Sequence, residues 1–261
     1  MLSTSRIAAA EYAKRRVLAD VTETWFGTFV HDTTHDDRAA ATQLLDTRLP
    51  SAAEPPATVG EDEAAQSLLD QLDALYERHG LPHRVVAGYD TETAVRLDPV
   101  LRDHGYERED YRALAPDSID LPSDDTGLRF ATHQHGSDEA QAVHESVGRD
   151  PAGIDYAAAV ASALDGREVV VSRGGEPVGA AGWYVHDGGA GDEPVARFTH
   201  VGVRPDAQDE GVGAELVRTV VDRCSVPAER MVVCATSEHV GFYESLGFDQ
   251  EASLWRFARL P

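Results

Sequence analysis

The sequence predicts a fold of the α+β class (mixed α/β), because short apolar runs typical of strands alternate with longer segments of helical periodicity. Two stretches carry this prediction. Residues 201–216 have the pattern of a strand end, a turn with two glycines and an amphipathic helix, and residues 231–259 follow with a strand, a short helix and a last strand. The region before residue 115 contains a separate alternation of strands and helices.

In the first half of the chain the clearest pattern is a helix over Glu61–His79, where apolar residues recur on one face and Gly80 follows as a stop signal. Strands are expected at Thr24–Val30, Ala41–Arg48, Arg84–Gly88 and Tyr106–Leu114. Thr91–His104 has a helical pattern. We expect Pro99 to interrupt it, because a proline inside a helix removes one hydrogen bond and clashes with the preceding turn.

The second half has its sharpest signals after the strand that ends at Val203. Pro205 stops that strand, and the helix after the turn places its apolar residues on one face: Val212, Leu216, Val217, Val220, Val221 and Cys224. A buried strand is expected at Met231–Ala235 and a short helix from Ser237 to Leu246. Gly247 closes that helix, and a last strand follows around Ser253–Arg259.

The polar, turn-rich stretch Ala115–Gly127 suits a linker. We therefore expect an N-terminal domain at residues 1–120, a linker at 121–127 and a C-terminal domain at 128–261.

The chain is strongly acidic. It has 46 Asp and Glu against 23 Lys and Arg, a formal net charge of −23, and Lys14 is its only lysine. Acidity spread along the whole sequence favours adaptation to molar salt over a local surface for a basic substrate. Nucleic acid is not an expected partner, because there is no basic stripe to meet phosphates.

The sequence has no apolar run long enough for a membrane span and no secretory signal pattern, so we expect a cytoplasmic protein that does not use a membrane. We expect Cys224 and Cys234 to be reduced residues of the core.

The turn before the second-half helix has the features of a phosphate site. Gly211 and Gly213 carry no side chain, so a ligand can approach the backbone closely. The first N–H groups of a helix have no partner within it and lie at the positive end of its dipole. A strand, a glycine-bearing turn and a helix N-terminus together form a binding site for an anion such as a phosphate.

These residues resemble the GNAT family, the Gcn5-related N-acetyltransferases. The family's [QR]-x-x-G-x-[GA] loop matches Gln208-Asp-Glu-Gly211-Val-Gly213, its V-x-P matches Val203-Arg-Pro205, and its Y-E-x-L-G-F matches Tyr243-Glu-Ser-Leu-Gly247-Phe248. The resemblance covers roughly residues 127–260. It implies a fold in which two adjacent parallel strands splay apart around the pantetheine arm of acetyl-CoA, with acetyl transfer to an amine acceptor.

The resemblance also implies roles for individual residues. Those expected to bind acetyl-CoA are Val201, Gly202, Val203, Gln208, Asp209, Glu210, Gly211, Val212, Gly213 and Ala214. Tyr243 is the expected general acid. Arg197 stands where some members carry a catalytic Glu, so the base is not identified by the motif. His200 or His239 is a candidate base, because an imidazole can take a proton near neutral pH.

The N-terminal region resembles a truncated, degenerate copy of the same domain. Its Leu101-Arg-Asp-His-Gly105-Tyr106-Glu aligns with Tyr243-Glu-Ser-Leu-Gly247-Phe248-Asp, and Leu101 stands where the second copy has Tyr243. The stretch equivalent to the binding loop, Thr58-Val-Gly-Glu-Asp-Glu63, lacks the motif. We therefore expect a tandem arrangement in which this region binds no acetyl-CoA.

No metal site is expected. His31, His35 and Asp37 have metal-binding side chains, but they lie in a predicted loop without a supporting cysteine. His133 and His135 alternate on a short strand-like segment that we expect at the surface.

The motif is also compatible with a second function, a non-catalytic acyl-CoA-binding or regulatory module. Arg197 in place of the catalytic Glu favours this alternative, and the presence of Tyr243 argues against it. The acceptor amine and the oligomeric state, monomer or homodimer, are not defined by the sequence.

Overall fold

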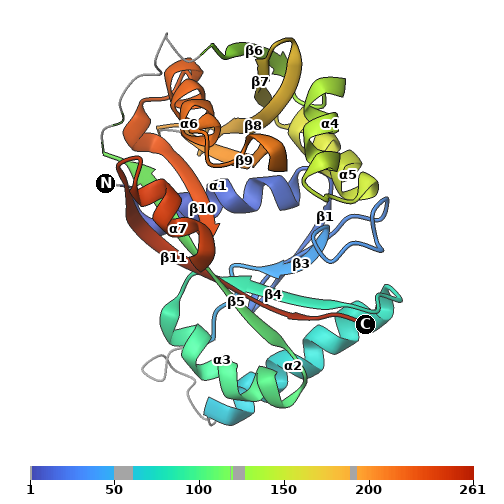
Figure 1. The fold of residues 1–261 in the computed structure, drawn as a ribbon. Coiled ribbons are helices and arrows are strands. Elements are labelled where there is room, and N and C mark those ends of the chain that lie inside the picture. The colour runs from blue at the N-terminus through green and yellow to red at the C-terminus, as the bar shows by residue number, and fades with distance from the viewer. Residues whose placement is uncertain (1, 50–60, 118, 120–126, 189–192) are drawn as a thin grey trace. The chain divides into compact units, whose positions relative to one another are not determined.

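The computed structural model describes residues 2–49, 61–117, 119, 127–188 and 193–261. The chain forms two compact units (Figure 1). Unit 1 consists of Met1–Val17 and Ala113–Glu251, and unit 2 of Leu18–Arg112 and Ala252–Pro261. No helix of the described residues is both long enough and apolar enough to cross a membrane.

Unit 1 contains most of the helices and a sheet with the order β10-β9-β8-β7-β6. Neighbouring strands from β6 to β9 are antiparallel, and β10 is parallel to β9. The helices of this unit are α1 (Thr4–Arg16), α4 (Asp138–Ser146), α5 (Pro151–Ala163), α6 (Val212–Arg223) and α7 (Ser237–Glu244). Its strands are β6 (Arg129–Gln134), β7 (Arg167–Arg173), β8 (Glu176–His186), β9 (Val195–Val203) and β10 (Met231–Thr236), and two 3₁₀ turns lie at Pro205–Ala207 and Ala228–Arg230.

Unit 2 has a sheet in the order β1-β2-β3-β4-β11 and two helices whose apolar faces share its core. Its elements are β1 (Asp20–Thr24), β2 (Gly27–His31), β3 (Thr42–Leu45), α2 (Glu61–Arg78), β4 (Arg84–Gly88) and α3 (Thr91–Asp103). Two further strands, β5 (Glu107–Pro116) and β11 (Phe248–Arg259), each begin in one unit and end in the other.

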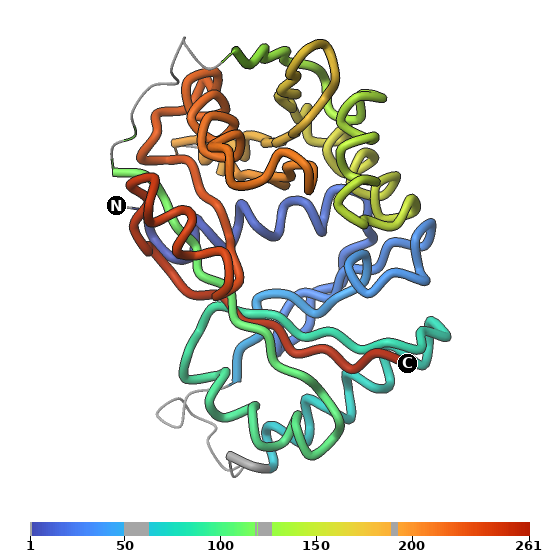
Figure 2. Tube along the Cα trace, viewed as in Figure 1, coloured from blue at the N-terminus to red at the C-terminus, as the bar shows by residue number. Residues whose placement is uncertain are grey.

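The division into units differs from the predicted boundaries at both ends of the chain. Helix α1, which the sequence analysis did not predict, belongs to unit 1, and residues 252–261 belong to unit 2. Within unit 1, Tyr184 on β8 donates a hydrogen bond to the carbonyl of Ala10 on α1. Figure 2 shows the blue helix α1 beside the strands of this unit. The predicted linker at 121–127 lies, except for Gly127, outside the described residues.

The sheet of unit 1 has helices on both faces, as alternate residues of its strands show. Val169 and Val171 on β7 lie in the large core with α6 and α7, whereas Val170 packs in a smaller cluster with Val143 of α4. Because successive side chains of a strand point to opposite faces, α6 and α7 cover one face and α4 covers the other. The fold is mixed α/β, as predicted from the sequence.

Helix α3 corrects one prediction. It runs without a break from Thr91 to Asp103 with Pro99 inside it. Leu97 and Leu101 are completely buried, while Pro99 is exposed. The carbonyl that loses its partner to the proline is that of Val95, an exposed residue that can bind water instead. Burial of the apolar face therefore outweighs the local cost of the proline.

Candidate functional site

The turn between β9 and α6 holds its backbone in the left-handed conformation at two places. Asp209 has φ 62° and Gly211 has φ 80°. Gly211 is the N-cap of α6, and no side chain caps this helix. The N–H groups of the first turn are therefore free to bind an anion, which the helix dipole also favours.

The side chains around this turn leave its backbone accessible. The exposed Gln208 donates a hydrogen bond from Nε2 to the carbonyl of Val203, 3.0 Å away, and so closes the turn rather than pointing to a ligand. Glu210 forms an ion pair with Arg173 at the end of β7. A Cβ at Gly211 would meet no atom within 4 Å, so the space in front of the turn is open.

Strand β9 diverges from β10 after a short parallel contact. The register pairs Met231 with Ala196 and Val232 with Arg197, after which β9 continues to Val203 and β10 to Thr236. Opposite β8, the register of β9 shifts between Phe198 and His200. This irregularity is typical of a strand that bends away from its neighbour. The predicted splay of two parallel strands is therefore present beside the turn.

Tyr243 lies on α7 in the large core of unit 1. It is 7% exposed and makes edge contacts with Phe242 and Phe248, at ring-centroid distances of 5.0 and 5.6 Å. Burial raises the pKa of its hydroxyl to about 12, with the positive charge of Arg197 acting in the opposite direction. The hydroxyl is thus protonated throughout the neutral pH range. Phe242 continues this aromatic group to the turn, because a Cβ at Gly213 would lie 3.4 Å from its ring.

Arg197 occupies the position at which related proteins were expected to have a catalytic Glu. It is buried, and its Nε lies 2.7 Å from Oε2 of Glu11 on α1. Although burial acts in the opposite direction, the neighbouring Cys234 and Glu11 raise the pKa of the guanidinium, so Arg197 cannot serve as a base. A carboxylate is therefore present at this position in space, but it comes from α1 and is neutralised by the arginine.

Sequence patterns do not indicate Glu11 and Lys14, because both come from a helix more than 180 residues away from β9. Lys14 forms an ion pair with the same carboxylate, and burial lowers the pKa of its ammonium group to about 8.

The two candidate bases lie in different surroundings. His239 is exposed at the start of α7, one helical turn before Tyr243, and its Nδ1 lies 3.1 Å from Oγ1 of Thr236. His200 on β9 is buried and contacts the rings of His135 and His144. Burial lowers the pKa of His200 well below its usual value.

His200 and Tyr243 are not brought together. Tyr243 belongs to the core on the α6 and α7 face, whereas the partners of His200 come from α4 and from the end of β6. The prediction that His135 lies at the surface is wrong, because its side chain is 4% exposed.

Comparisons with known proteins give the class of this domain. A family model described as the acetyltransferase (GNAT) domain matches residues 165–250, all within unit 1. No curated protein matches the chain. Residues 165–250 of unit 1 are therefore similar to the GNAT acetyltransferase domain.

Solved structures are similar over nearly the whole chain. A functionally unknown conserved protein from Staphylococcus epidermidis ATCC 12228 has a TM-score of 0.70 at 11% identity, with 95% of this chain and 96% of that chain covered. A GCN5-related N-acetyltransferase from Kribbella flavida has a TM-score of 0.64 at 18% identity, with coverages of 99% and 96%. A GCN5-related N-acetyltransferase-like protein from Streptococcus suis 89/1591 has a TM-score of 0.52 at 13% identity, with coverages of 92% and 88%. At these identities the likeness shows the fold, which is that of the GNAT acyltransferases.

Proposed function

We propose that unit 1 is an acetyl-CoA-dependent N-acetyltransferase that transfers the acetyl group to a primary amine by direct attack in a ternary complex. The observation that carries this proposal is the uncapped N-terminus of α6 beside the diverging strands β9 and β10. Free N–H groups at a helix N-terminus suit the pyrophosphate of the donor, and the space between two diverging strands suits an extended pantetheine arm. The residues present therefore fit acetyl-CoA.

In this proposal β9 binds the amides of the pantetheine arm through the backbone of Val201, Gly202 and Val203, which are partly exposed. The turn from Gln208 to Ala214 binds the pyrophosphate. A backbone N–H directed at the thioester carbonyl would stabilise the negative charge that develops on its oxygen. Holding both substrates in one complex supplies the orientation that the reaction needs.

The proton transfers are assigned to side chains of α7. The amine nitrogen attacks the thioester carbon, the carbon–sulfur bond breaks, and the sulfur leaves with a proton from Tyr243. The amine loses a proton to a base, directly or through water. His239 suits this role better than His200, because it is exposed and shares one face of α7 with Tyr243 at i, i+4 spacing.

We also propose that unit 2 is a degenerate copy of the domain. Both units contain a strand–helix–strand crossover with parallel strands, β3-α2-β4 and β9-α6-β10. In both, the next helix is followed by a glycine in the left-handed conformation, Gly105 with φ 79° and Gly247 with φ 86°, and then by an aromatic residue and a strand. In the stretch expected to correspond to the binding loop, residues 58–60 lie outside the described residues, and residues 61–63 belong to the start of α2.

Two measurements test the enzymatic proposal. Calorimetric titration with acetyl-CoA should show saturable binding, and release of free CoA should depend on an added amine from a panel of polyamines, amino acids, peptides and amino sugars. His239→Asn should lower turnover by about a hundredfold, the low end for loss of an acid–base group, and leave acetyl-CoA affinity unchanged. Binding without amine-dependent CoA release across the panel would instead favour a non-catalytic acyl-CoA-binding module.

A further inference from the structure

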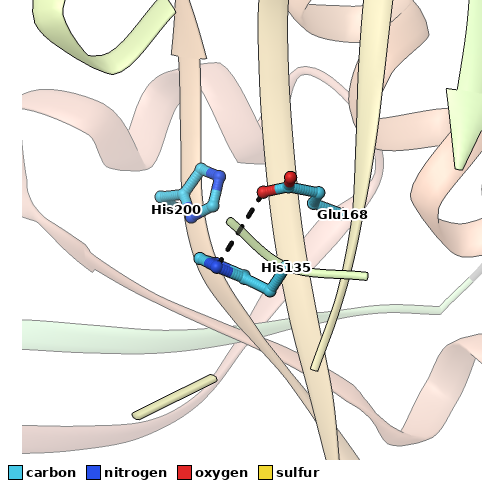
Figure 3. Close-up of side chains that lie close together, drawn as sticks. All are labelled: His135, Glu168 and His200. Carbon is cyan, nitrogen blue, oxygen red and sulfur yellow. Dashed lines mark ion pairs between the residues drawn. The ribbon is translucent and has the colours of Figure 1, made fainter. Parts of the chain in front are cut away.

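A row of three residues crosses the sheet of unit 1 on the α4 face. The register pairs Glu168 on β7 with Gly182 on β8, and Gly182 with His200 on β9. Directly paired residues of antiparallel strands project to the same face, so Glu168 and His200 flank a position without a side chain. His135, which follows β6, completes the group, and Figure 3 shows its ring beside the carboxylate and His200.

Gly182 makes this arrangement possible. A Cβ at this position would lie 2.4 Å from Oγ1 of Thr199, 2.6 Å from Cε1 of His200 and 3.0 Å from Cδ2 of His135. The two imidazole rings therefore occupy the space that any other residue would fill. The absence of a side chain at the centre of the row allows ligand-type atoms from β7, from β9 and from the residue after β6 to converge.

The atoms that face one another lack partners among the described residues. They are buried and form no hydrogen bond: Nδ1 and Nε2 of His135, Oε2 of Glu168 and Nε2 of His200. Nδ1 of His135 lies 3.9 Å from Oε2 of Glu168, too far for a hydrogen bond. Buried polar atoms without partners cost free energy, so a group of them implies a bound species that satisfies them together.

The opposite ends of two of these side chains are held in place. Oε1 of Glu168 accepts hydrogen bonds from the backbone N and the Oγ of Ser137, at 2.8 and 2.6 Å. Nδ1 of His200 lies 2.9 Å from Oγ1 of Thr199. In metal sites the second atom of a ligating histidine or carboxylate commonly has such a partner, which fixes the ligating atom toward the ion.

We propose that His135, Glu168 and His200 bind a zinc ion. One ligand atom from each residue lies within 4.8 Å of the others. In a tetrahedral zinc site with bonds of about 2.0 Å the ligand atoms are about 3.3 Å apart, so small side-chain rotations close the site. Two imidazoles and one carboxylate match the ligand preference of zinc, and the cation would supply a positive charge close to the completely buried Glu168, whose ion pair with His135 spans 3.9 Å.

The fourth position has two candidate occupants. The ring of His144 on α4 lies 4.2 Å from that of His200, centroid to centroid, and neither of its nitrogens has a partner among the described residues. A cavity of about 110 Å³ also adjoins the group and can hold water. Arg149 and Asp155 are the charged side chains that line this cavity besides Glu168. The zinc ligands lie on the α4 face of the sheet, opposite the face that carries Tyr243, and His200 directly precedes Val201 of the proposed pantetheine-binding strand.

The test uses the full chain without a polyhistidine tag, treated with a chelator and dialysed into molar KCl. Zinc content by mass spectrometry and affinity by competition with a chromophoric chelator should give one zinc per chain. Glu168→Gln keeps the size of the side chain and an oxygen that can accept the Ser137 bonds, and it should lower zinc affinity at least about a hundredfold. Gly182→Ala should also lower zinc affinity, because it displaces both imidazoles.

His186→Gln is the matched control, a partly buried histidine of the same unit on β8 that lies outside the group. It should bind zinc like the parent. Substoichiometric zinc in the parent, parent-like affinity in Glu168→Gln, or an equal loss in His186→Gln would each overturn the proposal. If circular dichroism shows that a variant does not fold, the absorption spectrum of the parent protein loaded with cobalt in place of zinc tests the proposal instead. Intense d–d bands typical of tetrahedral coordination support the site, and a weak octahedral spectrum rejects it.

Discussion

Arg197 on β9 and Glu11 on α1 form a buried ion pair in unit 1, with Nη2 and Oε2 2.7 Å apart. This contact joins the first helix of the chain to the strand that leads to the proposed binding turn. It also decides what the arginine at this position does. The guanidinium of Arg197 is paired with the carboxylate of Glu11, so it contributes to the stability of the fold rather than to proton transfer.

Removing one partner of this pair should be strongly destabilising, because the other charge remains buried without compensation. We expect Glu11→Gln to lower the free energy of unfolding by about 3 kcal/mol, as measured by chemical denaturation in molar salt. The double variant Glu11→Gln with Arg197→Met should recover much of this loss, since it removes the buried guanidinium and leaves only Lys14, whose side chain is 18% exposed, without the carboxylate. A single variant as stable as the parent would show that the pair contributes little.

The same pair predicts how stability responds to acid. The positive charges of Arg197 and Lys14 hold the pKa of Glu11 far below its usual value of 4.5, despite burial. A depressed carboxyl pKa contributes stability above the unfolded-state value and loses it as pH falls. Below about pH 4.5 the parent should therefore lose stability more steeply than Glu11→Gln, by up to about 1.4 kcal/mol per pH unit. Equal slopes in the two proteins would contradict this assignment.

Tyr243→Phe tests the proposed general acid. The substitution keeps the contacts with Phe242 and Phe248 and removes only the hydroxyl. Turnover should fall about a hundredfold, while the dissociation constant for acetyl-CoA changes little. Because the hydroxyl has a pKa of about 12, the parent should show no loss of activity from its ionisation below about pH 11. A variant as fast as the parent at every pH would make Tyr243 a core residue without a role in proton transfer.

The role of the turn before α6 in acetyl-CoA binding can be tested by comparing Gly211 with another glycine that has a left-handed backbone conformation. Gly211 has φ 80° and Gly80, which follows α2 in unit 2, has φ 66°, and a Cβ at either would meet no atom within 4 Å. Valine at either position imposes a similar left-handed strain, about 1–2 kcal/mol. Only Gly211→Val should weaken acetyl-CoA binding, at least about tenfold, because only this turn is proposed to bind the pyrophosphate. Calorimetry on both variants separates a local effect from general strain.

Folding should depend on salt. With a formal net charge of −23, self-repulsion opposes the compact state in dilute buffer, whereas at about 1 M salt the Debye length falls to about 3 Å. Circular dichroism and thermal melting should show a cooperative native state in molar KCl and its loss at low ionic strength. A fully native, cooperatively melting protein in dilute buffer would exclude adaptation to salt.

Local signals predicted the region around the binding turn well. Pro205, Gly211 and Gly247 mark breaks between elements: in the structure β9 ends before Pro205, α6 begins after Gly211, and α7 ends before Gly247. These residues act on the backbone within a few positions, so their effect is visible in the sequence. Pro99 shows the limit of this reasoning, because the burial of Leu97 and Leu101 keeps the helix intact.

Long-range pairings could not be predicted. Nothing near Glu11 indicates that its partner is Arg197, and more than thirty positions separate His135 from Glu168, and Glu168 from His200. The register of β7, β8 and β9 brings these residues together, with Gly182 providing space. A single glycine in a strand can have many different neighbours in space. The sequence around Gly182 therefore does not reveal that the rings of His135 and His200 occupy the space beside it.

The path of the last strand has a consequence for how the protein is made. The outer half of β11, Trp255 to Arg259, pairs with Gly88 to Arg84 of β4, so the sheet of unit 2 lacks a strand until these residues have been synthesised. On the ribosome, residues 18–112 emerge early, but more than 130 further residues must be synthesised before the last strand of unit 2 is available to complete its sheet. Until residues 255–259 are in place, β4 is an exposed edge of the unit 2 sheet, which can pair with another chain and aggregate.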